Sequence, residues 1–205
     1  MRILAFLLLL VLAVPVRAET LTILAVGDSI TAGLGLDAEA AYPAKLEKEL
    51  REKGHDIRIV NGGVSGDTMA DGLARLDWSL TPEVRAVIVA LGANDALRGL
   101  APEATEKSLD TILSRLADRR LPVLLAGLKA PRNLGEDYGV AYDALFARQA
   151  SRHGVLYYPF LLDGVATDPH LNQPDGIHPN AEGAGVIARR LVPLTEALIA
   201  RAGGK

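Results

Sequence analysis

Short apolar runs alternate with amphipathic stretches along most of the chain, and this alternation predicts its secondary structure. Five apolar runs have the length and composition of buried strands: Leu21–Val26, Ile57–Val60, Ala86–Leu91, Val123–Leu128 and Val155–Phe160. The stretches between and after them repeat apolar residues at helical spacing and predict helices over Ala41–Lys53, Asp67–Leu80, Pro102–Arg119, Tyr138–His153 and Pro179–Ala202. Strands that alternate with helices form βαβ units, so the pattern predicts a three-layer α/β/α domain with a five-stranded parallel sheet.

The first 18 residues differ from this pattern and have the features of a secretory signal peptide. Arg2 supplies a positive start, Ile3–Val14 is an unbroken apolar run, and Val16-Arg17-Ala18 offers a cleavage site. The run is shorter than the roughly 20 residues that a membrane-spanning helix needs. We therefore expect cleavage after Ala18, a single domain over residues 19–205, no stable membrane anchor and a periplasmic or secreted location. The alternative is an uncleaved N-terminal anchor.

Composition narrows the classes of function. The 205 residues include 25 acidic and 22 basic side chains, for a formal net charge of −3, and no cysteine. This slight negative charge argues against non-specific nucleic-acid binding, which needs a basic face. The absence of cysteine from the sequence excludes disulfides, thiolate metal sites, cysteine nucleophiles and a lipid-modified N-terminal cysteine. The histidines are scattered and no H-E-x-x-H pattern occurs, so we expect no metal site.

Four polar, glycine-rich segments are predicted to meet at one edge of the sheet. Ligands of open α/β sheets bind beyond the carboxyl ends of the strands, where three of these segments begin and a loop before the last helix supplies the fourth. The segments are Gly27–Gly33, Asn61–Thr68, Gly92–Asp95 and Asp175–Asn180. Each alone is typical of an ordinary turn. Their joint placement predicts a functional site at this edge.

Ser29, His178 and Asp175 in these segments have the chemistry of a nucleophile, a base and an orienting acid. A serine hydroxyl is a poor nucleophile until a base accepts its proton. Asp175 lies three residues before His178, a spacing that lets its carboxylate fix the imidazole tautomer and stabilise the imidazolium. The remaining histidines lack both a comparable acid partner and a strand-end position: His55, His153 and His170.

Acyl transfer also needs hydrogen-bond donors for the developing oxyanion. The Asn94 side-chain amide and the backbone N–H groups of Ser29 and Gly66 are candidates. A glycine suits this role because no side chain shields its amide from a closely approaching oxygen. The alternative is that Gly66 only forms a turn before a helix capped by Asp67 or Thr68.

Taken in order, these blocks resemble those of the GDSL, or SGNH, hydrolase family. Gly27-Asp28-Ser29-Ile30 is similar to the nucleophile block, and Gly66, Asn94 and the Asp175/His178 pair match the remaining blocks. The resemblance covers essentially the whole chain after residue 18. It implies a flavodoxin-like sheet (the SGNH hydrolase fold), no cofactor, the triad Ser29, Asp175 and His178, and an oxyanion hole from Ser29, Gly66 and Asn94. One difference is an extra glycine in Asn61-Gly62-Gly63, which we expect to loosen that loop.

Within the family the chain is most similar to the small periplasmic branch of multifunctional thioesterases, lysophospholipases and arylesterases. This implies hydrolysis of short to medium acyl esters and thioesters. In that branch the loop after the Asn block, here Ala96–Ala101, moves when acyl chains bind. The candidate acyl-groove residues are Leu97, Leu100, Ala130 and Leu134, although ordinary packing explains each of them equally well. We expect a small-molecule substrate, no nucleic-acid partner and a monomer.

Two other functions remain open from the sequence. A carbohydrate or peptidoglycan O-acetylesterase would use the same triad, but it would want aromatic platforms for sugar rings, and the chain has 1 Trp, 5 Tyr and 3 Phe. A flavodoxin-like module for a nucleotide or phosphate could use Gly27–Gly33 at a helix start. Asp28 and Asp67 place negative charge where a phosphate would sit, however, and no Walker lysine or G-x-G-x-x-G pattern follows the first strand.

Overall fold

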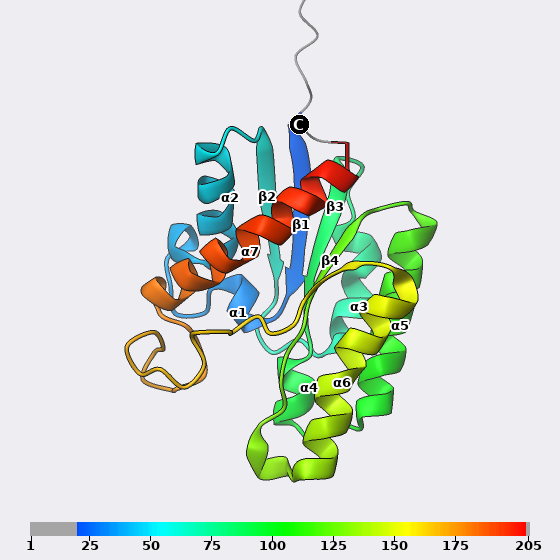
Figure 1. Cartoon of the computed structure of the whole chain (residues 1–205), viewed down its shortest axis with the longest axis vertical. Helices are drawn as coiled ribbons and strands as arrows, with labels where there is room; N and C mark the ends of the chain where they lie inside the picture. The colour runs from blue at the N-terminus through cyan, green and yellow to red at the C-terminus, as the bar shows by residue number, and fades with distance from the viewer. Residues whose placement is uncertain (1–19, 204–205) are drawn as a thin grey trace, which may run out of the picture.

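A parallel five-stranded sheet lies between two layers of helices (Figure 1). The computed structural model describes residues 20–203, so the predicted signal peptide lies outside the described residues. The strands are β1 (Leu21–Gly27), β2 (Ile57–Gly63), β3 (Val84–Ala90), β4 (Val123–Ala126) and β5 (Leu156–Tyr158). They are ordered β2-β1-β3-β4-β5, and every neighbouring pair is parallel. The predicted α/β/α fold with a flavodoxin-like sheet is confirmed.

The helices divide between the two faces because the chain reverses its direction across the sheet. They are α1 (Ser29–Ala32), α2 (Tyr42–Glu52), α3 (Met69–Ser79), α4 (Ala93–Leu97), α5 (Pro102–Asp118), α6 (Glu136–His153) and α7 (Ala181–Arg201). The connection from β1 to β2 leads toward one edge of the sheet, whereas the later connections lead toward the opposite edge. Right-handed crossovers then place α2 on one face and α3, α5 and α6 on the other. Helix α7 returns to pack on α2 (Figure 1).

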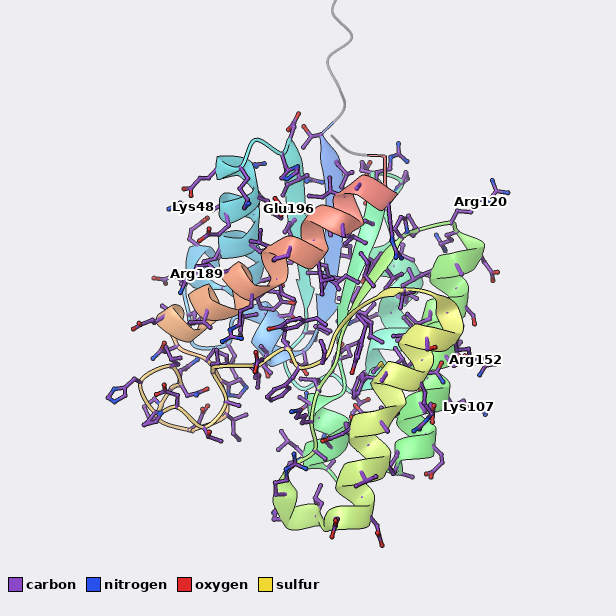
Figure 2. The ribbon with its side chains drawn as sticks, viewed as in Figure 1. Lys48, Lys107, Arg120, Arg152, Arg189 and Glu196 are labelled. Atoms are coloured by element: carbon purple, nitrogen blue, oxygen red, sulfur yellow. The ribbon has the colours of Figure 1, made fainter. Side chains whose placement is uncertain are left out.

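Burial on both faces explains the apolar runs of the strands. All seven residues of β1 are buried, and the β3 residues from Ala86 to Ala90 are at most 1% exposed. Such strands read as continuous hydrophobic sequence because helices cover both sides of a parallel sheet. The outer faces of the helices are polar, and Figure 2 shows Lys48, Lys107 and Arg152 extending away from α2, α5 and α6. No helix within residues 20–203 is long and apolar enough to cross a membrane.

The structure differs from the sequence-based predictions in two short helices, in an extension of β2, and in β4 and β5, which end at Ala126 and Tyr158 before the predicted Leu128 and Phe160. Helices α1 and α4 were not predicted, because four or five residues are too few to show a 3.6-residue period. Strand β2 continues through Gly62 and Gly63, which pair with Val26 and Gly27. The expectation that the extra glycine loosens this segment is therefore wrong. A Cβ at Gly63 would lie 2.2 Å from the backbone nitrogen of Ala32, so a glycine lets the two segments pack closely.

The carboxyl ends of β1, β2 and β3 bring three connections to the same end of the sheet. Strand β1 leads into α1, β2 leads into a turn over Val64–Asp67, and β3 leads into α4. The long segment between β5 and α7 returns to this end, at the lower edge of the sheet in Figure 1. The four polar segments noted in the sequence are thus brought together by the topology.

Candidate active site

Ser29 begins α1 directly after a tight exit from β1. The Asp28 side chain caps the helix by accepting from the Ile30 N–H at 3.0 Å. A Cβ at Gly27 would lie 1.9 Å from Thr31 Oγ1 and 2.9 Å from the Ala90 carbonyl oxygen. The strand can therefore turn into the helix here because residue 27 has no side chain. This turn leaves the Ser29 hydroxyl half-buried at the end of the sheet.

The structure brings the three residues of the predicted triad into one hydrogen-bonded line. Ser29 Oγ lies 2.8 Å from His178 Nε2, and His178 Nδ1 lies 2.7 Å from Asp175 Oδ2. The other oxygen, Asp175 Oδ1, accepts the backbone N–H groups of Ile177 and His178, each at 2.9 Å. These two backbone donors, together with the His178 ring, lower the pKa of Asp175 to about 2. The carboxylate is therefore charged at neutral pH.

His178 is held by a loop with its own hydrogen bonds. Gln173 donates from Nε2 to the carbonyls of Leu34 at 2.7 Å and Pro179 at 3.0 Å, and its backbone N–H donates to His178 O at 2.8 Å. Asn180 then caps α7 by accepting the N–H groups of the first helical turn. The sequence did not indicate this role for Gln173. One of its partners, Leu34, follows α1, and the other two, His178 and Pro179, come close to Gln173 only when the chain folds back on itself.

Two of the other histidines also have acid partners, contrary to the sequence-based expectation. His153 Nε2 lies 2.7 Å from Asp110 Oδ1, and His55 Nε2 lies 3.4 Å from Glu196 Oε1. These acids come from α5 and α7, so their proximity arises from helix packing and is not visible in the local sequence. His178 differs from both in its contact with the Ser29 hydroxyl.

Gly66 lies in a turn whose conformation favours glycine. The Asp67 N–H donates to Val64 O at 3.2 Å and closes a four-residue turn in which Gly66 has φ of +90° and Ser65 has a negative φ. A positive φ at the third position is typical of a type II turn, which favours glycine there. The Val64 N–H also donates to Gly27 O at 3.0 Å, which joins this turn to the exit of β1 beside Ser29. Thr68, one of the two residues considered, is the N-cap of α3.

Asn94, in the first turn of α4, faces the same turn. Its side-chain Nδ2 donates to Asp67 O at 2.9 Å, and because an amide nitrogen carries two hydrogens, one donor is left for another acceptor. The next residue, Asp95, is 2% exposed and accepts from the Met69 N–H at 2.8 Å and the Thr105 hydroxyl at 2.9 Å. Burial raises the pKa of Asp95. These contacts fix α4 against the start of α3, and with it the position of Asn94.

A cavity of about 200 Å³ opens where these groups meet. Its walls combine the reactive and donor residues with apolar side chains: Ser29, Ile30, Leu34, Ser65, Gly66, Ala93, Asn94, Leu97, Ile177 and His178. Three of the apolar residues are substantially exposed: Leu34 at 47%, Leu97 at 49% and Ile177 at 45%. A largely apolar pocket with a few convergent polar groups is the usual form of a small-molecule site.

The predicted acyl-groove residues are not all placed at this cavity. Leu97 lies on its wall, but Leu100, Ala130 and Leu134 do not. Ala130 is 5% exposed, and its N–H donates to Asp143 of α6 at 2.8 Å, so it belongs to the packed interior. Leu100 is tied to α6 instead, since its carbonyl accepts the Tyr138 hydroxyl at 2.9 Å. Leu134 ends a 3₁₀ turn over Arg132–Leu134.

Asp28 is a buried carboxyl group directly beside the serine. It is 1% exposed, and within the described residues its Oδ2 atom has no hydrogen-bond partner. Burial raises its pKa to about 6, against the lowering effects of the Ile30 N–H and of nearby His178.

Within residues 20–203, no group of three or more His, Asp or Glu side chains is arranged to hold a metal ion.

Comparisons with known proteins identify the class of this chain. The sequence profile of the GDSL-like lipase/acylhydrolase family matches residues 25–186, and the chain belongs to this family of hydrolases, as the sequence blocks predicted.

Particular relatives share most of its length. Esterase TesA of Pseudomonas aeruginosa is 41% identical over 164 residues, which are 80% of this chain and 82% of that protein. Thioesterase 1/protease 1/lysophospholipase L1 of Escherichia coli K12 is 39% identical over 182 residues, or 86% of this chain and 85% of that protein. A crystal structure of TesA matches with a TM-score of 0.82 and 38% identity, over 86% of this chain and 99% of that chain. The similarity to esterases and a thioesterase thus extends over most of the chain.

Proposed function

We propose that this protein hydrolyses acyl esters and thioesters through a covalent acyl-enzyme on Ser29. The observation that carries the proposal is the line from Ser29 Oγ through His178 to Asp175, with contacts of 2.8 and 2.7 Å at the mouth of an apolar cavity. Nucleophile, base and orienting acid within hydrogen-bond reach are the geometric requirement for this chemistry.

In the first half of the reaction, His178 Nε2 accepts the hydroxyl proton as Ser29 Oγ bonds to the acyl carbon. The carbonyl oxygen becomes an oxyanion, which the N–H groups of Ser29 and Gly66 and the free amide hydrogen of Asn94 stabilise. Each such donor typically contributes about 3 kcal/mol to the transition state. His178 then gives its proton to the leaving alcohol or thiol as the bond to the acyl carbon breaks.

In the second half, water takes the place of the alcohol. His178 accepts a proton from the water as its oxygen attacks the acyl-enzyme, and returns the proton to Ser29 Oγ as the acid leaves. Asp175 keeps its charge throughout, because two backbone N–H groups and the His178 ring hold its pKa at about 2. It therefore stabilises the imidazolium without taking the proton itself.

The cavity favours a short or medium acyl chain over a sugar. Its volume of about 200 Å³ lies below the roughly 300–1,000 Å³ of pockets for drug-sized ligands. Leu34, Leu97 and Ile177 supply apolar surface at its mouth, and its lining residues in the described chain include no Phe, Tyr or Trp on which a sugar could stack. We further propose that the mature enzyme acts in the periplasm or outside the cell, on the basis of the signal-like sequence of residues 1–18.

The test is hydrolysis of p-nitrophenyl esters from acetyl to dodecanoyl and of matched acyl thioesters by the purified protein. Ser29→Ala is the informative variant. Ser108→Ala is its matched control, because Ser108 lies on α5 and donates only to the Ala104 carbonyl of its own helix among the contacts described. We expect wild type and Ser108→Ala to cleave several chain lengths with equal rates, and Ser29→Ala to lose at least about 10³-fold in kcat.

The outcomes separate the possible functions. Activity on acetyl esters alone would overturn the proposed acyl range and favour an O-acetylesterase. Equal rates for wild type and Ser29→Ala would overturn the assignment of the nucleophile.

A further inference from the structure

Arg75 of α3 connects two segments of the active site that lie far apart in the sequence. Its Nε donates to Asp67 Oδ2 at 2.5 Å, and its Nη2 donates to the Gly27 carbonyl at 3.0 Å. Its third nitrogen, Nη1, lies 3.4 Å from Ser79 Oγ, one helical turn further along α3. The Arg75 and Asp67 side chains are only 22% and 12% exposed, so water screens this ion pair less than one on the open surface.

Both contacts of Arg75 are next to proposed oxyanion donors. Gly27 is separated from Ser29 by a single residue, and Asp67 directly follows Gly66. Asp67 also accepts the Asn94 side chain through its carbonyl, at 2.9 Å. The guanidinium of Arg75 therefore contacts the backbone of the Ser29 segment at Gly27 and the side chain of Asp67 in the Gly66 segment, and through Asp67 it is linked to Asn94.

We propose that Arg75 is a positioning residue that sets the separation of the Ser29 turn and the Gly66 turn, so that their N–H groups converge on one oxyanion. This inference rests on the proposed acyl-transfer function. A planar guanidinium suits the task because it presents several N–H donors in a fixed fork, whereas a lysine ammonium is a single point on a flexible stem. Arg75 does not reach the cavity wall itself, so it acts on the transition state through the backbone that it holds.

The first test compares Arg75→Lys with wild type on p-nitrophenyl butyrate. Displacement of oxyanion donors by a fraction of an ångström to 1 Å affects the transition state more than the bound substrate. We expect kcat to fall roughly 10- to 100-fold, while KM stays within about 3-fold because the apolar cavity wall is unchanged. Arg119→Lys is the matched control, because Arg119 pairs with Asp77 on the exposed side of α3 at 2.7 Å and should keep wild-type kcat.

A second test uses chemical rescue to separate positioning from a general structural role. Arg75→Ala removes the guanidinium, and added guanidinium ion at millimolar concentration should restore part of kcat, whereas ammonium ion should not. Asp67→Asn removes the charged acceptor with little change in volume and should lower kcat less than Arg75→Lys does. The kcat of the double variant should be no lower than that of Arg75→Lys alone, because Arg75→Lys already disrupts the contact that Asp67→Asn would weaken.

Several results would overturn the inference. The first is a kcat of Arg75→Lys within twofold of wild type. The second is a rise in KM that accounts for the lost activity while kcat is unchanged. The third is a fall in kcat that matches the fall in folded fraction measured by circular dichroism. If Arg75→Ala does not fold, the Asp67→Asn variant decides, and unchanged kcat there counts against the inference. Failure of the proposed function is recognised separately, because wild type would then be inactive on every ester or would match Ser29→Ala.

Discussion

Replacing Asp28 by asparagine is expected to change how the stability of the protein depends on pH. Asparagine has nearly the same shape and keeps an oxygen that can accept the Ile30 N–H, now 3.0 Å from Asp28 Oδ1. Its amide nitrogen would take the place of Oδ2, which has no partner within the described residues. The main physical change is therefore the loss of a group that can ionise while it is buried.

The sign of the effect follows from the raised pKa. Burial lifts the pKa of Asp28 from 3.8 to about 6, so between these values the folded protein holds a proton that the unfolded chain has released. The free energy of unfolding must then fall as the pH rises through this window. A rise in pKa of about two corresponds to about 3 kcal/mol in all, most of which is lost between pH 4 and pH 7.

The measurement is urea denaturation, followed by circular dichroism, at several pH values from 4 to 7. The free energy of unfolding of Asp28→Asn minus that of wild type should be about 2–3 kcal/mol larger at pH 7 than at pH 4. Carboxylates whose pKa is lowered, such as Asp71, stabilise the fold above their unfolded pKa and lose that effect in acid. Their contribution is the same in both proteins, so it cancels when the two free energies of unfolding are subtracted.

Asp37→Asn is the control, because Asp37 is exposed and its side chain makes no capping hydrogen bond. Its stability relative to wild type should not change over the same range. A pH-independent difference between Asp28→Asn and wild type would refute the reasoning, since it would mean that Asp28 has the same pKa in the folded and unfolded chains.

Three further predictions follow from the site and the surface. Asp175→Asn should reduce kcat by roughly 10³- to 10⁴-fold because the His178 tautomer is no longer fixed, and steady-state kinetics will show whether the loss is this large. Gly63→Ala should lower the free energy of unfolding, measured by urea denaturation, by more than about 2 kcal/mol, because the alanine Cβ would lie 2.2 Å from the Ala32 backbone nitrogen. The fluorescence of Trp78, 91% exposed and the only tryptophan in the chain, should shift little on unfolding, and a large blue shift in the folded state would contradict its exposure.

The strands, the long helices and the order of the active-site blocks were all predictable from the sequence. These features depend on local patterns, since a strand buried on both faces shows a continuous apolar run and a packed helix repeats apolar residues every three or four positions. The position of the site followed from topology alone, because the carboxyl ends of parallel strands meet at one edge. The short helices α1 and α4 were not predicted, because four or five residues are too few to show a helical period.

Only the tertiary structure decided which side chains touch. Ser29 and His178 are 149 residues apart, and their 2.8 Å contact depends on how the loop before α7 is held against α1. The acid partner of His153 and the link from Arg75 to Gly27 likewise join segments that meet only when helices pack on the sheet. Sequence periodicity says which face of an element is buried, but contacts across elements depend on their relative positions to within an ångström. Those positions are fixed by the packing of the whole core.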